Sequence, residues 1–206
     1  MSLRSIWMAS VSLGILCVTA AYVGAVEDTP QRSEFPTDGV QVTTTVSDCP
    51  VDVVDAVSGD FEAVTLSFSD NLLTPERRSL HCRIGIDYQF QAGWRFWRPA
   101  TVARGFHNLV NGRQRAVWVV RTRLNGGAWG SEPPLVAQGP VTDYFQKDGQ
   151  DGEVWGEAPT ACGATSAHID VEIIGSLFFG PVDDTTASTI STIDSIDTEI
   201  DWQRCN

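Results

Sequence analysis

The sequence lacks the short motifs that mark the common classes of enzyme and metal site. It has no G-x-S-x-G elbow, no H-E-x-x-H helix and no P-loop. It has three histidines, His81, His107 and His168, so a metal cage or a serine–histidine–acid device would need one of them. His168 and Asp170 share one face of an expected strand, but we expect each histidine to be a surface or structural residue. No N-x-[ST] sequon occurs, so N-glycosylation is not expected.

Positive charge is also scarce. Lys and Arg total 14 against 26 Asp and Glu, and the formal net charge is −12. This balance argues against a general affinity for nucleic acid or for an anionic membrane surface. The charge is uneven, because residues 77–123 carry +9 between segments of −10 (residues 26–76) and −12 (residues 124–206).

The first 25 residues have the pattern of a secretory signal peptide. Arg4 supplies a positive start, residues 6–23 form an apolar stretch, and Val23-Gly24-Ala25 offers small residues for cleavage. We therefore expect cleavage after Ala25, a secreted extracellular protein, and no stable membrane insertion of the mature chain. The alternative is a membrane anchor, because the apolar stretch is about as long as the shortest spanning helices, roughly 17 residues.

The expected organisation after the signal peptide is a leader followed by one domain. Residues 26–44 contain two prolines, several acids and few apolar residues, which is typical of a disordered leader. Residues 45–206 are long enough for one well-buried core and short for two, so we expect a single domain there.

The cysteines predict disulfides in this domain. Cleavage of the signal peptide would leave an even number of cysteines, Cys49, Cys82, Cys162 and Cys205, which predicts two disulfides. No two of them are closer than 33 residues, which disfavours a zinc site, and no metal is expected. Three pairings are open. We expect Cys49–Cys205 with Cys82–Cys162 if the first and last strands are antiparallel neighbours.

Apolar residues recur at spacing two, the period of a strand with one buried face. The pattern occurs in four runs: Val64, Leu66, Phe68; Ile84, Ile86, Tyr88, Phe90; Ile169, Val171, Ile173; and Ile196, Thr198, Ile200, Trp202. Gly and Pro clusters separate the runs, and no long stretch has helical periodicity. The sequence therefore predicts an all-β fold, an antiparallel β-sandwich with a jelly-roll-like arrangement.

A group of arginines is the first candidate binding site. Arg113, Arg115, Arg121 and Arg123 fall at positions that share one face of an expected strand. If exposed, their guanidinium groups would hold an anionic polysaccharide or cell-wall polymer. The alternative is that they pair with neighbouring acidic strands, each pair contributing roughly 0.2–1 kcal/mol. The acidic positions are Asp170, Glu172, Asp197, Glu199 and Asp201.

A second candidate is the aromatic segment Trp94-Arg95-Phe96-Trp97-Arg98. Exposed, Trp94 and Trp97 would form a stacking platform for sugar rings or another ligand. The alternative is ordinary burial, because Trp94 and Phe96 alternate with Arg95 and a two-sheet core needs large side chains.

Acidic residues suggest two further sites with little specificity. A carboxylate pair for glycoside hydrolysis could be Glu153 with Glu157, or Asp170 with Glu172, although a solvated acidic face explains the same residues. Residues 148–153 have the composition of a calcium loop but lack its D-x-[DN]-x-[DN]-G spacing. Calcium is therefore the one cofactor that the sequence leaves open, and a plain turn is the alternative.

Eight short landmarks occur in a recognisable order. They are Asp48-Cys49-Pro50, the strand Val64–Phe68, Cys82, Arg104-Gly105-Phe106, Gly139-Pro140, Ala161-Cys162-Gly163, Asp194-Ser195-Ile196-Asp197 and Trp202-Gln203-Arg204-Cys205. Over residues 46–206 this order resembles the secreted family known as domain of unknown function 4360, found in fungi and bacteria. The sequence departs from the family pattern before two of the cysteines, at Ser47-Asp48 and at Ala161. The family has no established activity, so the resemblance implies only secretion, disulfides and one β domain.

These observations favour a non-enzymatic extracellular binding or cell-surface module. Its partner would be a polysaccharide or cell-wall polymer, with a protein partner as the other candidate, bound through the loops or through the arginine-aromatic region 94–123. The alternatives are a secreted carbohydrate-active hydrolase that uses a carboxylate pair and a calcium-dependent adhesion module.

Overall fold

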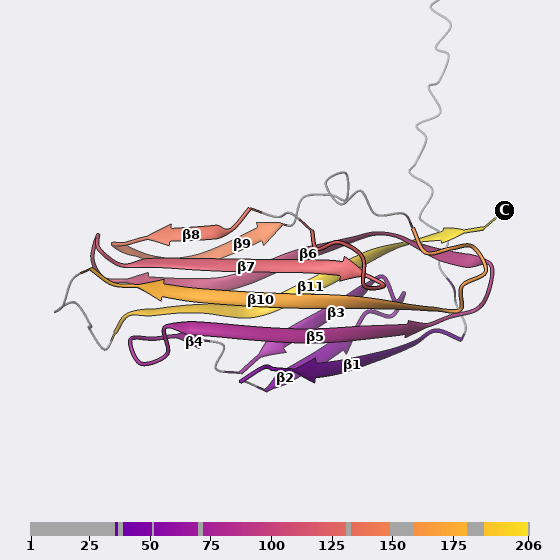
Figure 1. The fold of residues 1–206 in the computed structure, drawn as a ribbon, viewed down its shortest axis with the longest axis horizontal. Helices are drawn as coiled ribbons and strands as arrows, with labels where there is room; N and C mark the ends of the chain where they lie inside the picture. Colours follow the sequence, from indigo (N-terminus) through magenta and orange to yellow (C-terminus); the bar gives the residue numbers. More distant parts are fainter. Residues whose placement is uncertain are drawn as a thin grey trace, which may run out of the picture. The chain divides into compact units, whose positions relative to one another are not determined.

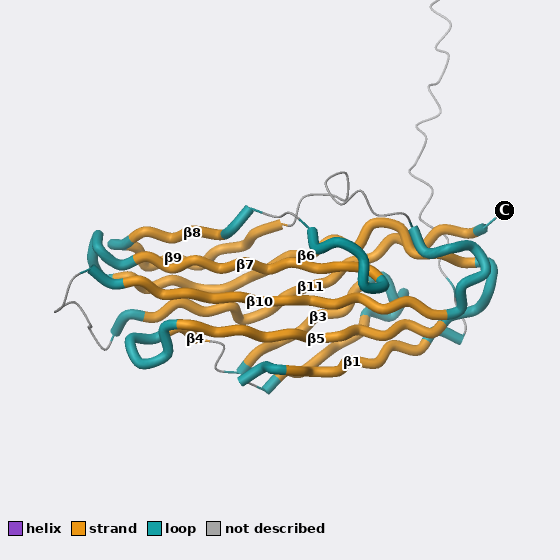
Figure 2. The backbone as a smooth tube through the Cα atoms, in the orientation of Figure 1, coloured by secondary structure: helices purple, strands orange, loops and turns teal. Residues whose placement is uncertain are grey.

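The computed structural model describes residues 36, 39–50, 52–69, 72–130, 133–148, 159–180 and 188–205, without the side chains of residues 72, 96–99 and 148. The predicted signal peptide lies outside these residues. Within them all regular secondary structure is β-strand (Figure 2). No helix in these ranges is long and apolar enough to cross a membrane.

The strands form two antiparallel sheets (Figure 1). In chain order the strands are β1 (Gln41–Ser47), β2 (Val53–Val57), β3 (Ala63–Phe68), β4 (Leu72–Leu73), β5 (Ser79–Gln89), β6 (Trp94–Leu109), β7 (Arg115–Leu124), β8 (Leu135–Gln138), β9 (Val141–Asp148), β10 (Ser166–Phe178) and β11 (Ile190–Arg204). One sheet has the order β1-β5-β10-β7-β8, and the other has the order β2-β3-β11-β6-β9, with β4 paired to β11. Most successive strands lie in different sheets, so the predicted antiparallel sandwich with jelly-roll-like connections is confirmed.

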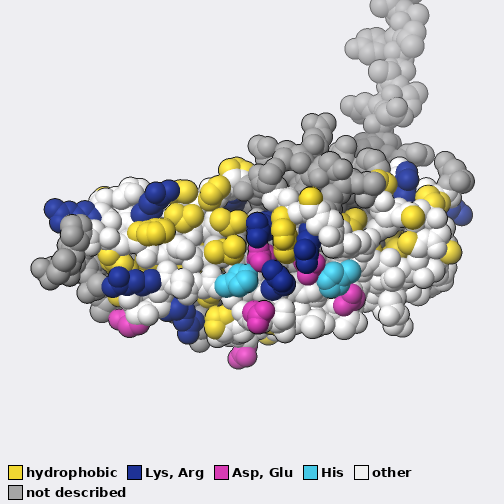
Figure 3. Space-filling model, viewed as in Figure 1, with side chains coloured by type: hydrophobic (Ala, Val, Ile, Leu, Met, Phe, Trp, Pro, Cys, Tyr) yellow, Lys and Arg dark blue, Asp and Glu magenta, His cyan; other side chains and the backbone are white. Residues whose placement is uncertain are grey.

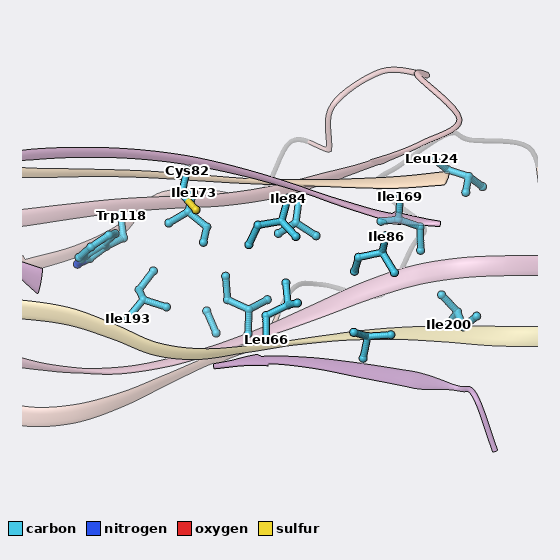
Figure 4. Packing of buried hydrophobic residues seen from close by; sticks show 14 of the residues in the cluster. Leu66, Cys82, Ile84, Ile86, Trp118, Leu124, Ile169, Ile173, Ile193 and Ile200 are labelled. Carbon is cyan, nitrogen blue, oxygen red and sulfur yellow. The ribbon is translucent and has the colours of Figure 1, made fainter. Parts of the chain in front are cut away.

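The core lies between the sheets, and period-two alternation builds it. On β5 the residues Leu80, Cys82, Ile84, Ile86 and Tyr88 are buried, and the residues between them face outward. The four predicted runs lie on β3, β5, β10 and β11, and their apolar residues point inward. Side chains from both sheets meet in Figure 4. Burial of these side chains is the main force that holds the sheets together.

The folded chain begins earlier than expected. We predicted a leader up to residue 44, but β1 starts at Gln41 and pairs with β5 from Gln41↔Gln89 onward. Val40 is buried in the core just before the strand. The strand was missed because β1 contains a polar run of threonines, and only alternate residues at its start are half-buried.

The predicted disulfides form, but the expected pairing is wrong. The bonds are Cys49–Cys82 and Cys162–Cys205, with Cα–Cα distances of 4.1 and 5.7 Å. The expectation assumed that the first and last strands are neighbours, whereas β1 and β11 lie in different sheets. Cys49 follows β1, whose register with β5 brings it beside Cys82. Each bond therefore joins segments that are already close.

Removing either disulfide should lower the free energy of unfolding by about 4 kcal/mol, because each bond closes a loop of 33 or 43 residues in the unfolded chain. Urea denaturation of Cys49→Ser/Cys82→Ser and of Cys162→Ser/Cys205→Ser tests this value. The two double variants serve as controls for each other, since each retains the other bond.

A proteolytic map of the unreduced protein tests the pairing itself. It should yield one cross-linked peptide pair that contains Cys49 with Cys82 and another that contains Cys162 with Cys205. A peptide that joins Cys49 to Cys205 would contradict the pairing.

Candidate functional site: the outer face of the five-stranded sheet

Charged side chains gather on the outer face of the five-stranded sheet, in three consecutive cross-strand rows over β5, β10 and β7. The rows are Arg83–Glu172–Arg121, Gly85–Asp170–Arg123 and Asp87–His168–Asn125, the last residue lying just beyond β7. We call these nine positions the charged face. Figure 3 shows basic, acidic and histidine side chains at its centre. Because residues two apart in a strand point the same way, register alone brings the rows together.

Glu172 is the most deeply buried charge of this face, with 2% of its surface exposed. Its Oε1 accepts hydrogen bonds from Arg83 Nη2 at 2.8 Å and from His81 Nε2 at 3.0 Å. Its Oε2 accepts from Arg121 Nε at 2.5 Å and also pairs with Arg121 Nη2. Both carboxylate oxygens are therefore satisfied by charged or polar donors, as a buried charge requires.

These contacts fix the protonation state of Glu172. Burial alone would raise the pKa of Glu172, but the hydrogen bonds from Arg83, His81 and Arg121 outweigh it and lower the pKa to about 2. Glu172 therefore stays ionised at any pH at which the protein is expected to work. A general acid needs the opposite shift, so Glu172 does not suit the acid step of glycoside hydrolysis.

The indole ring of Trp129 lies over the arginines of the charged face. The guanidinium carbons of Arg123, Arg121 and Arg83 are 4.4, 4.8 and 5.7 Å from the ring centroid. Arg123 Nε also donates to Asp170 Oδ2 at 2.6 Å. Such cation–π contacts attract the ring to the guanidinium groups and favour this position of the indole. The result is an ordered aromatic side chain on a polar surface.

The third row is locked by hydrogen bonds around His168. Its Nδ1 bonds to Asp87 Oδ1 at 2.7 Å, and its Nε2 lies 3.4 Å from Asp170 Oδ1. Asn125 Oδ1 accepts the backbone N–H of His168 at 2.8 Å. The imidazole lies over Gly85, where a Cβ atom would come within 2.8 Å of His168 Cε1. The absence of a side chain at Gly85 therefore makes room for this ring.

The same contacts shift the titration of His168. Partial burial alone would lower the pKa of His168, but the hydrogen bonds to Asp87 and then Asp170 outweigh it, so the pKa lies above its ordinary value. The protonated ring bridges two carboxylates. It therefore holds Asp87 in position, most firmly in mildly acidic solution.

A polar groove of about 340 Å³ adjoins this row. Its lining residues are Thr43, Asp87, Tyr88, Gln89, Asn125, Ser166, Ala167 and His168. Carboxylate, amide, hydroxyl and imidazole groups thus converge on a space of the size of a small-ligand pocket. Asp87 is half exposed, and among the described residues its Oδ2 has no recorded hydrogen bond, so this oxygen is available to a ligand.

The structure separates the predicted arginine group. Arg121 and Arg123 belong to the charged face, where they pair with Glu172 and Asp170, as the alternative interpretation required. Arg115 lies at the start of β7, six residues and about 20 Å from Arg121 along the strand. Arg113 is not on the strand at all but in the preceding turn, so the predicted four-arginine stripe is wrong. Asp197 and its acidic neighbours lie in the other sheet.

The other predicted sites are the two tryptophans, the second carboxylate pair and the candidate calcium loop. Trp94 is half-buried and packs against the core, which agrees with burial rather than with a stacking platform. The side chain of Trp97 lies outside the described residues. Glu153, Glu157 and all but the first residue of the candidate calcium loop at 148–153 also lie outside them. These candidates remain predictions.

His107 and Ser191 form a buried pair that looks like part of a catalytic triad. His107 Nδ1 and Ser191 Oγ share a hydrogen bond of 2.8 Å, and Asp143 lies opposite His107 on β9. However, Ser191 is fully buried and its Oγ accepts a hydrogen bond from Trp118 Nε1 at 2.7 Å. Burial lowers the pKa of His107 to about 4, so the ring is neutral. This pair therefore satisfies polar groups in the core, as expected for a structural histidine.

Several site residues were missed in the sequence. Trp129 follows Gly126 and Gly127 in a loop, and a loop position is a usable signal, because binding residues are often carried on loops. Arg83 and Asp87 alternate with the buried residues of β5, which shows that they face outward. Their partners on β10 could not be found, because strand order is a tertiary property.

The fold and the face just described define a disulfide-bonded β-sandwich with a polar, ligand-sized groove on one sheet. The chain belongs to the family described as Domain of unknown function (DUF4360), whose sequence profile matches residues 40–205. The resemblance noted in the sequence is therefore confirmed, and the profile includes all four bonded cysteines.

Two further comparisons add little. No curated protein matches the chain. A solved structure with similarity is titled as TmCBM61 in complex with beta-1,4-galactotriose, with 12% identity, 82% of this chain covered, 91% of that chain covered, and a TM-score of 0.27. At this TM-score the similarity supports no conclusion about the function of this chain.

The low pKa of Glu172 predicts an acid-dependent loss of stability. Because its folded pKa of about 2 lies below the ordinary value of 4.5, the stabilisation is present above pH 4.5 and is lost as the pH falls towards 2. Glu172→Gln should lower the free energy of unfolding at pH 7 by about 1–3 kcal/mol and flatten its pH dependence in that window. Urea denaturation at several pH values measures both effects.

Glu199→Gln is the matched control, because Glu199 is an exposed carboxylate of β11. It should change neither quantity by more than about 0.5 kcal/mol. Equal stability and equal pH slopes for Glu172→Gln and the wild type would show that the buried ion cluster does not stabilise the fold.

Proposed function

We propose that the protein is a secreted polysaccharide-binding module that holds a neutral glycan in the groove beside Asp87 and His168. The observation that supports this most directly is the fixed set of polar groups around that groove. A module that recognises sugars needs such groups in place before the ligand arrives, because ordering them on binding would cost affinity.

The groove offers the hydrogen-bond chemistry that sugar hydroxyls require. Asp87 supplies a carboxylate acceptor, and Asn125 retains an amide donor because its Oδ1 is used by the backbone of His168. Thr43, Ser166 and Gln89 add hydroxyl and amide groups that both donate and accept. Pairs of neighbouring hydroxyl groups on a sugar ring would satisfy these partners in a bidentate way.

Trp129 supports the same function from the neighbouring rows. Its ring is fixed over Arg123, and Arg123 is linked through Asp170 to His168 at the groove. A half-buried indole beside polar donors suits the apolar face of a sugar ring in an extended chain. The charged face would then hold one sugar unit in the groove and a neighbouring unit beside the indole.

A neutral ligand fits the charged face better than the anionic polymer predicted earlier. Arg83, Arg121 and Arg123 are offset by Glu172 and Asp170 within the face, and Asp87 adds a third carboxylate. The formal charge of the whole chain is −12, which repels polyanions at a distance. The paired arginines thus serve as scaffold and as support for Trp129.

Binding rather than hydrolysis is the proposed role of this face. Glu172 has its pKa lowered to about 2 and is enclosed by its partners, so it is a poor proton donor to a leaving group. The other predicted carboxylate pair, Glu153 with Glu157, and the candidate calcium loop after Asp148 lie outside the described residues.

Asp87→Ala should weaken binding of a neutral polysaccharide at least about tenfold, because it removes the acceptor that sugar hydroxyls would use. Trp129→Ala should weaken it by several-fold. Affinity electrophoresis of the oxidised protein in gels that contain soluble galactan, mannan, xylan or β-glucan identifies the ligand, and isothermal titration calorimetry then gives the affinities.

The matched control is Asp55→Asn, which alters an exposed carboxylate on β2 of the other sheet. It should bind as the wild type does. Salt should have little effect on binding of a neutral glycan. Salt-sensitive binding to polygalacturonate that Arg121→Glu abolishes would overturn the neutral-ligand proposal in favour of an anionic polymer.

A further inference from the structure

A pair of aromatic side chains stands on the outer face of the six-stranded sheet, whereas the charged face belongs to the five-stranded sheet. Phe106 of β6 and Tyr144 of β9 are cross-strand partners, with ring centroids 4.9 Å apart and planes inclined by 50°. Tyr144 is 77% exposed, the highest value among the large apolar side chains described as exposed.

Polar rows flank the aromatic pair on both sides. The register of β6 with β9 places Arg104 opposite Gln146 and Asn108 opposite Thr142, each about 7 Å from the aromatic row along the strands. Arg104 Nε donates to Gln146 Oε1 at 3.1 Å, and Thr142 Oγ1 donates to Asn108 Oδ1 at 2.9 Å. We call these six residues the aromatic face.

Contacts with β11 and the loop before it hold the polar rows in place. Arg104 Nη1 forms an ion pair with Asp197, and Asp197 in turn accepts a hydrogen bond from Thr65 Oγ1 at 2.7 Å. At the other end Asn108 Nδ2 donates to the carbonyl of Ser188 at 2.6 Å. The side chains that flank the rings are therefore positioned before any ligand binds.

Two of the sequence landmarks meet at this face, and the structure explains them physically. Gly105 lies between Arg104 and Phe106, where a Cβ atom would come within 2.1 Å of the carbonyl oxygen of Thr192. Only glycine permits this close approach of β6 to β11, and the strand then points Arg104 and Phe106 outward together. The second landmark supplies Asp197, the ion-pair partner of Arg104.

We propose that the aromatic face is a second saccharide-binding surface, on which a sugar ring of a neutral polysaccharide stacks against Tyr144 and Phe106. The apolar face of the sugar would cover the rings, and its hydroxyl groups would reach the polar rows on either side. A large apolar partner fits less well, because polar pairs border the rings along both strands. An anion fits less well, because Asp197 offsets the charge of Arg104.

This inference shares only the class of ligand with the proposed function, since the two surfaces lie on different sheets. Two surfaces on one molecule would bind two polysaccharide chains, or two separate segments of one polysaccharide chain. Binding to both raises the apparent affinity and cross-links the polymer without any new contact.

The experiment compares the number of sites and cross-linking in three variants. The oxidised protein is titrated into whichever of galactan, mannan, xylan and β-glucan binds it. Calorimetry measures the stoichiometry, and light scattering measures cross-linking of the polymer. Tyr144→Ala should remove about half of the sites and abolish cross-linking. Asp87→Ala should do the same from the other sheet, because it weakens the groove and leaves only the aromatic face, and the double variant should bind at least about tenfold more weakly than either single variant.

Val54→Ala is the matched control, because Val54 is an exposed apolar side chain on β2 of the same sheet, 68% exposed. It should leave stoichiometry and scattering unchanged. Tyr144→Trp, unlike Tyr144→Ala, should keep the wild-type stoichiometry and scattering, because tryptophan also provides a stacking ring. A thermal melt of each variant verifies that the fold is intact.

The outcomes separate the two proposals. If Tyr144→Ala keeps the wild-type stoichiometry and scattering while Asp87→Ala loses binding, Tyr144 and Phe106 are a cross-strand packing pair only, and the groove proposal stands. If Tyr144→Ala loses all binding and Asp87→Ala loses none, the aromatic face is the binding site and the groove proposal fails. Absence of wild-type binding to all four polysaccharides overturns both.

Discussion

The register of β10 between β5 and β7 is the constraint on which the rest of the molecule depends. It places Ile169, Val171 and Ile173 in the core, and the same alternation places Asp170 and Glu172 on the outer face. There Arg83 lies on one side of them, on β5, and Arg121 and Arg123 lie on the other, on β7. A shift by one residue would bury the carboxylates without their partners and expose the isoleucines. Hydrophobic burial and ion pairing therefore enforce the same register, each from its own face of the sheet.

The two sheets use polar residues in different ways on their outer faces. On the five-stranded sheet the ion pairs are dense, and Glu172 is buried beneath its partners, so the charges cancel locally and hold Trp129. On the six-stranded sheet one ion pair, Arg104–Asp197, holds a polar row beside the half-buried ring of Phe106 and the exposed ring of Tyr144. In both cases the charges are paired with each other beside aromatic side chains. This local cancellation of charge is the reason that we propose a neutral ligand.

Much of the fold and little of the site could be predicted from the sequence. Period-two alternation along the strand of Ile84 and Ile86 defines a buried face whatever its neighbours are, so class and core followed directly. The predicted disulfide pairing was wrong because the pairing depends on which strands are adjacent. The prediction of a four-arginine stripe was wrong in part for the same reason. Residues 113–115 precede or begin β7, and only the register of β7 with β10 places Arg121 and Arg123 beside carboxylates.

The sequence by itself determined the all-β class, the four bonded cysteines and the inward-facing residues, because each of these follows from local period or from cysteine number and spacing. Only the tertiary structure decided that Asp87, His168 and Asn125 share a row beside a groove, and that Phe106 meets Tyr144. These residues are up to 81 positions apart, as in the pair Asp87 and His168, and strand order brings them together. Strand order is set by packing of whole sheets, which no local pattern encodes.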